Sequence, residues 1–158
     1  MKTFSLVIAL VVFSTTSALA EEQHEDWFKY FEGTWTWKNA EGVGGEVTWK
    51  AVAANTANIG TGKSDDGTKS AWLSGWSAKE KRIITQWFNE KGAQGLVRYK
   101  IQDANTLTGP GITHGDDGTT KAVVTMEKNN EKQFTVYWRE RTVDGEKAED
   151  VVLVAKRK

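Results

Sequence analysis

Hydrophobic and polar residues alternate along most of the chain with the two-residue period of β-strands that bury one face. The alternating runs are rich in Val, Ile, Thr and Trp, which favour extended backbone. Turn sequences rich in Asp, Asn and Gly separate the runs about every dozen residues. The pattern predicts ten strands, at residues 33–38, 45–53, 55–62, 70–78, 82–88, 93–101, 106–112, 120–128, 132–141 and 148–157.

Short connections between these runs predict antiparallel neighbours, since a parallel return needs a crossover of roughly a dozen residues or more. Strands paired in sequence order make a meander, and an open meander leaves two edges with unpaired backbone groups. Closing the sheet removes both edges. We therefore predict an all-β fold, a closed antiparallel up-and-down β-barrel of about ten strands. A two-sheet sandwich is the alternative. The aromatic-rich segment Glu25–Phe31 predicts a short N-terminal helical turn that covers one end of the barrel.

Residues 1–20 have the pattern of a cleaved signal peptide. Lys2 supplies a positive charge, Phe4–Phe13 an apolar run, and Ser17–Ala20 the small residues that signal peptidase recognises. The apolar run is shorter than the roughly 20 residues that cross a bilayer. We expect cleavage after Ala20, a secreted or periplasmic location, and one domain over residues 21–158 without an integral membrane segment.

Composition narrows the classes of partner. The chain has 21 basic and 21 acidic residues, and loss of the leader removes only Lys2 from this balance. A near-neutral domain has no electrostatic basis for binding nucleic acid or anionic membranes. The chain has no cysteine, so its core must hold the fold without disulfides. Eight Trp, three Tyr and six Phe, two of which lie in the leader, supply large apolar surfaces.

Alternation assigns the two faces of each strand. In the run 132–141, Phe134 and Trp138 share one face, whereas Arg139 and Arg141 share the other. Several other strands carry apolar residues on both faces. We therefore predict an outer aromatic patch around Trp72 and Trp76, covered by the N-terminal turn or by another subunit.

A barrel of this size can hold one small molecule in its lumen. We expect an apolar or amphipathic ligand, with no nucleic acid as partner. The predicted ligand-binding residues are Trp35, Trp37, Trp49, Trp87, Trp138 and Arg139. Further polar candidates, which are more often solvated and outward-facing, are Gln86, Arg98 and Tyr137. The alternative is a lumen filled by tryptophans, in a structural or protein-interaction module that is a monomer or weak homodimer.

Two groups of residues carry a resemblance to known families. The first strand opens with Gly33-x-Trp35, which resembles the start of lipocalins and other calycin barrels. A second motif resembles a family of exported bacterial lipocalin-like domains of unknown function. This second motif is Gly75-Trp76-Ser77 followed by Lys81-Arg82 and Gln86-Trp87-Phe88.

The resemblance implies a binding barrel without an established reaction. In lipocalin-type barrels the tryptophan closes one end, and a basic residue from the last strands packs over its indole. Arg141 and Arg157 are the two candidates here, through a cation–π contact with Trp35.

The residues offer little for catalysis. The chain has no cysteine and only two histidines. It therefore cannot supply the four Cys or His ligands of a structural zinc site, and it offers little for a nucleophile activated by a neighbouring base. We expect His24 to lie in a disordered acidic N-terminal segment. We expect no catalytic residue, no metal site and no cofactor. Two weaker alternatives remain: haem ligated by His114 pointing into a barrel mouth, and an enzyme that positions its substrate with Tyr137 or Arg139.

Overall fold

The computed structural model of the protein describes residues 15–158, so most of the predicted leader lies outside the described part. A helix precedes the strands, and a single 3₁₀ turn, η1 (Ala53–Asn55), interrupts them. The elements are α1 (Thr15–Phe31), β1 (Gly33–Asn39), β2 (Gly44–Val52), β3 (Ala57–Ser64), β4 (Lys69–Ser77), β5 (Arg82–Asn89), β6 (Gln94–Ile101), β7 (Thr106–Gly115), β8 (Gly118–Asn130), β9 (Gln133–Val143), β10 (Glu146–Lys147) and β11 (Val151–Arg157).

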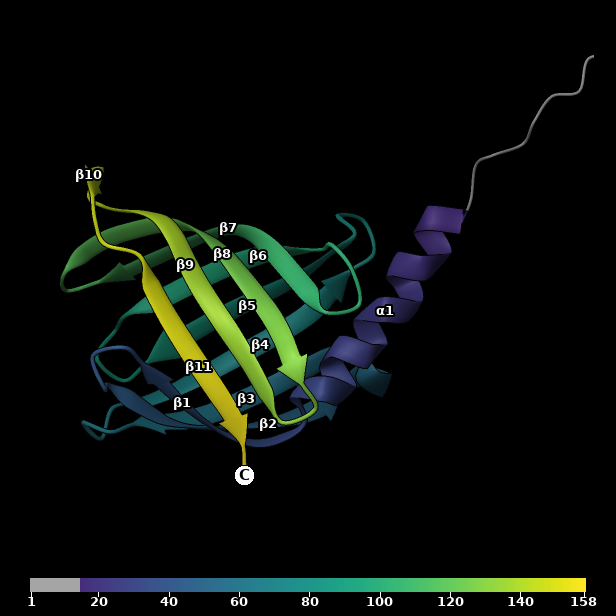
Figure 1. Ribbon diagram of the computed structural model, residues 1–158, viewed down its shortest axis with the longest axis horizontal. Helices are drawn as coiled ribbons and strands as arrows, with labels where there is room; N and C mark the ends of the chain where they lie inside the picture. Colours follow the sequence, from purple (N-terminus) through teal and green to yellow (C-terminus); the bar gives the residue numbers. More distant parts are fainter. Residues whose placement is uncertain (1–14) are drawn as a thin grey trace, which may run out of the picture.

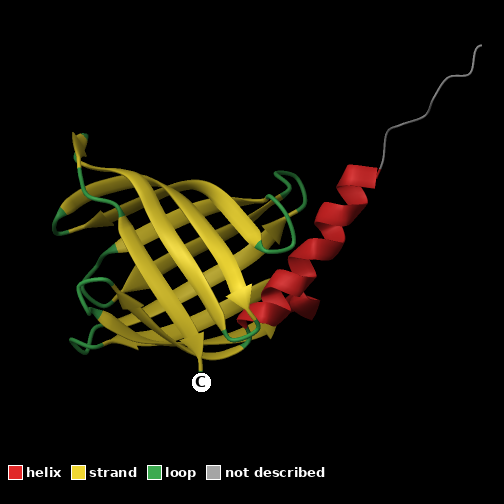
Figure 2. Ribbon diagram, in the orientation of Figure 1, coloured by secondary structure: helices red, strands yellow, loops and turns green. Residues whose placement is uncertain are grey.

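The strands form one closed antiparallel barrel (Figures 1 and 2). Strands β1 to β9 pair in chain order, β11 lies between β9 and β1, and every pairing is antiparallel. The two-residue β10 pairs only with the last residues of β9, so the wall of the barrel has ten strands. The predicted up-and-down barrel is confirmed, and the sandwich is not found.

Helix α1 is longer than the single turn predicted from the aromatic segment. It begins at Thr15 and ends at Phe31, so it continues through the position at which we expect cleavage. Its last turns place Trp27 and Phe28 in fully buried positions, with Tyr30 and Phe31 beside them. Figure 1 shows this part of α1 against one end of the barrel, which we call the helix end; the opposite end is the far end. Within residues 15–158, no helix has the length and apolar character that crossing a membrane requires.

Aromatic rings close the helix end around Trp35. The Trp35 indole is fully buried, and its Nε1 donates to the carbonyl of Phe31 at 2.8 Å. Phe134 packs on the indole with its ring centroid 4.9 Å away. The Arg157 guanidinium lies 4.4 Å from the indole centroid and donates to the carbonyls of Tyr30 and Glu32. Arg157, and not Arg141, is therefore the basic residue over the tryptophan.

The prediction of a disordered segment around His24 is wrong. His24 is only 5% exposed, because α1 continues through it and presses it against the barrel. Its ring stacks on Trp76 with the centroids 4.6 Å apart and the planes 3° from parallel. Neither imidazole nitrogen has a hydrogen-bond partner among the described residues.

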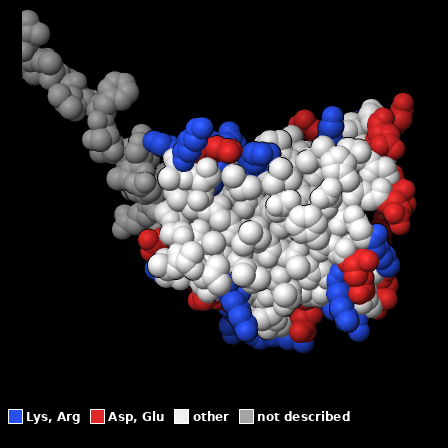
Figure 3. All heavy atoms as spheres, turned by 180° about the vertical axis from the view of Figure 1, so that it is seen from behind, with Lys and Arg blue, Asp and Glu red and all other residues white. Residues whose placement is uncertain are grey.

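The outer aromatic patch predicted around Trp72 and Trp76 is also misplaced. Trp72 lines the interior, and Trp76 is covered by His24. The outer face of β3, β4 and β5 instead exposes Ile59, Leu73 and Phe88, which alternate with the interior residues. Figure 3 shows a wide surface without charged side chains on this side of the barrel.

Candidate ligand-binding cavity

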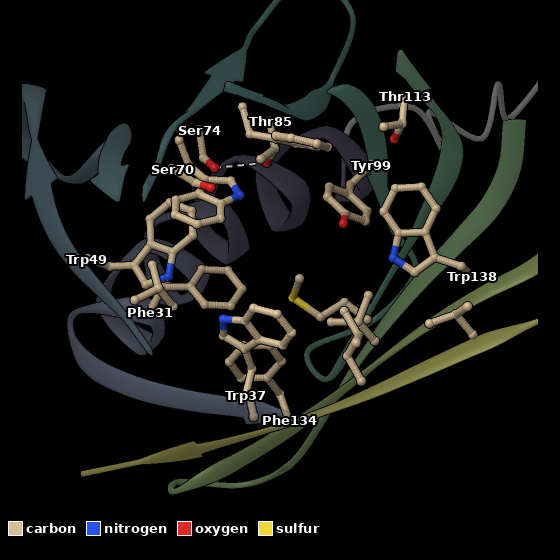
Figure 4. A pocket seen from close by; sticks show the side chains of 18 of the residues that line it. Phe31, Trp37, Trp49, Ser70, Ser74, Thr85, Tyr99, Thr113, Phe134 and Trp138 are labelled. Carbon is tan, nitrogen blue, oxygen red and sulfur yellow. Dashed lines mark hydrogen bonds between the residues drawn. The ribbon is translucent and has the colours of Figure 1, made fainter. Parts of the chain in front are cut away.

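The barrel encloses a cavity of about 510 Å³, so its lumen is not filled. Phe31 at the end of α1 lies at its floor, and its wall extends to residues beside the hairpins of the far end, such as Thr68 and Thr120. Apolar side chains form most of the wall, and hydroxyl groups are interspersed among them (Figure 4). The aromatic residues of the lining are Phe31, Trp37, Trp49, Trp72, Trp87, Tyr99, Phe134 and Trp138.

Four of the six residues predicted to bind ligand come together in this lining: Trp37, Trp49, Trp87 and Trp138. They come from β1, β2, β5 and β9, and in each strand they lie on the face that alternation turns inward. The structure thus brings together indoles from four separate strands. Their role in binding stays a prediction.

The other two predicted residues lie elsewhere. Trp35 packs against Tyr30 and Phe134 at the helix end and is not among the residues that line the cavity. Arg139 is exposed on the outer face, where its guanidinium lies 4.3 Å from the ring centroid of Tyr137. Both residues of the proposed positioning enzyme, Tyr137 and Arg139, are therefore outside the barrel.

Glycines on neighbouring strands give the tryptophans their space. Trp49 pairs across the sheet with Gly60, and Trp87 pairs with Gly95. A Cβ atom on Gly60 would lie 2.8 Å from the Trp49 ring, and one on Gly95 would lie 2.1 Å from Nε1 of Trp87. Each indole thus lies flat over a residue without a side chain, and the rest of the lumen stays open.

Hydroxyl groups, which can both donate and accept hydrogen bonds, are the commonest polar groups of the cavity. Figure 4 shows the Tyr99 hydroxyl and the indole nitrogen of Trp138 directed toward the open space. Neither group has a hydrogen-bond partner among the described residues. By contrast, the Ser74 and Thr85 hydroxyls bond to each other at 2.8 Å. A ligand with acceptor atoms would satisfy the free donors.

Burial keeps the tyrosines of this region neutral. It raises the pKa of Tyr99 well above its usual range, and it raises the pKa of Tyr30 from 10.0 to about 12, although the nearby Arg157 opposes this second shift. Both phenols therefore keep their protons at a pH at which tyrosines of an unfolded chain lose theirs.

This difference predicts a loss of stability in alkali. Above about pH 10 the unfolded chain binds fewer protons than the folded chain, so the free energy of unfolding falls as the pH rises toward 12. Replacing Tyr99 with Phe removes one of these protons, and we expect a shallower fall in urea titrations across this range. Tyr137→Phe, on the outer face, is the matched control; equal slopes for both variants would contradict the assignment.

One lining residue was missed because a β-bulge shifts the alternation. Lys121 pairs with Thr142 and Val123 pairs with Arg139, so β9 has one residue more than β8 between these pairs. Glu140 takes up the extra residue with a φ of +55°, in the left-handed region. After the bulge Arg141 lines the cavity, whereas uninterrupted alternation predicts that it faces outward with Arg139.

The histidine considered for haem does not point into the barrel. His114 is exposed, and its Nδ1 lies 3.0 Å from the Thr119 hydroxyl, whereas the preceding residue, Thr113, lines the cavity. Among the described residues no group of three His, Cys, Asp or Glu side chains is placed to hold a metal ion. Gln86 is exposed, and Arg98 lies 3.6 Å from Glu80 in an ion pair outside the cavity.

Comparisons with known proteins give only a distant likeness of fold. No family model matches the chain, and no curated protein matches it. Among solved structures, EF1p2_mFAP2b bound to DFHBI is 16% identical, with 85% of this chain and 99% of that chain covered and a TM-score of 0.41. A redesigned β-barrel, mFAP1, bound to DFHBI is 14% identical, with 83% and 97% covered and a TM-score of 0.39. These likenesses are too weak to identify a ligand for this chain.

Proposed function

We propose that this protein is an exported lipocalin-like barrel that binds a small apolar or amphipathic molecule in its lumen and carries out no reaction. The observation that carries the proposal is the cavity of about 510 Å³, walled by indoles from five strands. Ligand sites in proteins are typically cavities of about 300–1,000 Å³ with an apolar wall and a few polar groups. Export rests on the leader pattern of residues 1–20.

The alternative of a filled barrel with a structural role has less support. Its predicted docking patch around Trp72 and Trp76 is turned inward or covered by α1. The exposed apolar residues on β3 to β5 are compatible with a protein partner that binds in addition to a ligand. They do not account for the open lumen.

A neutral fluorescent probe tests the proposal. N-phenylnaphthylamine is apolar and uncharged, and its emission rises when it leaves water. We expect saturable binding to the folded protein, with quenching of tryptophan emission as the probe enters among the indoles. Native mass spectrometry of protein isolated without denaturation would then identify any molecule that is already bound.

A variant that fills the lumen provides the contrast. Met126 lines the cavity from β8, and Met126→Trp adds an aromatic ring to the space that a ligand needs. We expect binding of the probe to fall at least tenfold. Val152 is 39% exposed on the outer face, so Val152→Trp adds the same ring outside the barrel and should leave binding unchanged. Equal binding by both variants would contradict a site in the lumen.

A further inference from the structure

The charges in the cavity wall are all of one sign. Among the 26 residues that line the cavity there is no Asp or Glu, and the two charged residues are Lys63 and Arg141. Lys63 is exposed and lies on the outward phase of β3, beside the hairpin that follows. Arg141 is half-buried at the far end and follows Trp138 by three residues on β9.

The bulge at Glu140 is what turns Arg141 toward the cavity. A residue other than glycine rarely adopts a φ of +55°, and such strained positions gather at binding sites. Without the extra residue, β9 would continue its alternation and place Arg141 on the outer face beside Arg139. The barrel therefore holds an unfavourable backbone conformation at the one residue that decides where this guanidinium points.

The guanidinium has donors to spare. It carries five N–H groups, and its hydrogen bond within the protein runs to the backbone carbonyl of Glu149. The ion pairs found among the described residues do not include Arg141. Carboxylates do occur in the far-end hairpins, but Asp66, for example, is paired with Lys91 at 2.8 Å. A half-buried guanidinium without an ionic partner favours an anion that reaches it from the cavity.

We propose that the lumen takes an amphipathic anion, with its carboxylate, sulfonate or similar acidic head on Arg141 at the far end and its apolar body among the tryptophans. This assignment rests on the proposed function, because it names the class of ligand for the same cavity. The free N–H group of Trp138 and the Tyr99 hydroxyl would donate hydrogen bonds to acceptor atoms deeper along such a molecule.

Two dyes with the same aromatic body separate the charge from the cavity. Anilinonaphthalene sulfonate differs from N-phenylnaphthylamine by its sulfonate. We expect Arg141→Gln to weaken binding of the sulfonate dye about tenfold, because the charge-assisted hydrogen bond between the guanidinium and the sulfonate is lost. The affinity for the neutral dye should change by less than about twofold, because the apolar wall of the cavity remains. The matched control, Arg139→Gln, removes an arginine from the outer face of the same strand. It should change the binding of neither dye.

Salt gives a second measurement that needs no variant. In the unmodified protein, binding of the sulfonate dye should weaken as ionic strength rises, whereas binding of the neutral dye should not. If neither dye binds the folded protein, the proposed function itself fails. A different result refutes only the anionic head group. In that case the neutral dye binds, but binding of the sulfonate dye depends neither on Arg141 nor on salt, and the lumen is a ligand site without a preference for anions.

Discussion

Replacement of Trp35 with Ala should lower the free energy of unfolding by about 3–5 kcal/mol, the usual cost of removing a large buried aromatic ring. The Trp35 indole is fully buried and lies between Phe134 and the guanidinium of Arg157. Its removal also frees the carbonyl of Phe31, which accepts its N–H at 2.8 Å. The loss therefore combines a cavity, a cation–π contact and a hydrogen bond that joins β1 to the end of α1.

Urea denaturation followed by circular dichroism measures this loss. Trp37→Ala is the matched control, because Trp37 lies two residues further along the same face of β1 but borders the cavity. Removing its indole enlarges a space that is already open, so we expect a clearly smaller loss of stability. Equal losses at the two positions would mean that Trp35 does not anchor the helix end as its contacts indicate.

Replacement of Gly95 with Ala should have the second-largest effect, a loss of about 1–3 kcal/mol through overpacking. The new Cβ would lie 2.1 Å from Nε1 of Trp87, so the indole must leave its place over β6. The direction open to it is the lumen, where it would occupy the volume that a ligand needs. We therefore expect weaker binding of N-phenylnaphthylamine together with the lower stability, measured on the same preparation.

Gly75→Ala is the matched control, because it makes the same chemical change at a position where the new methyl group has space. A Cβ on Gly75 would meet Ala57 at 3.8 Å, an ordinary contact, and the φ of Gly75 is not in the positive region. This control should keep both stability and dye binding close to those of the unmodified protein. A Gly95 variant that behaves like it would show that Trp87 does not rest on β6.

The barrel could be predicted from the chain because local signals agreed with the global fold. Most runs of alternation ended at an Asp-, Asn- or Gly-rich turn, and short turns allow only antiparallel neighbours. The helix was underestimated because Thr15–Ala20 was interpreted as part of a signal peptide, a pattern that concerns processing and not the conformation of the chain. The burial of His24 follows from that longer helix, so it could not be foreseen either.

The cavity was predictable to the extent that it depends on alternation. The two-residue period places Trp49, Trp87 and Trp138 inside, but it does not say how deep along the barrel each one lies. Trp35 and Trp37 share a face, yet one seals the helix end and the other borders the open space. The inward position of Arg141 could not be predicted, because it depends on a bulge at Glu140. Glutamate gives no sign in the sequence of a left-handed backbone.

The seam between β1 and β11 joins segments that lie far apart in the sequence. The Thr36 hydroxyl donates to the carbonyl of Lys156, 120 positions later in the chain, and Lys158 donates its backbone N–H to Thr34. Contacts of such sequence separation form slowly, because a long loop must close before they contribute. Until β11 has paired with both neighbours, β1 and β9 remain open edges and the lumen has no wall on one side. Strand β11 thus acts as the latch of the barrel, because the wall of the lumen is complete only once this strand is in place.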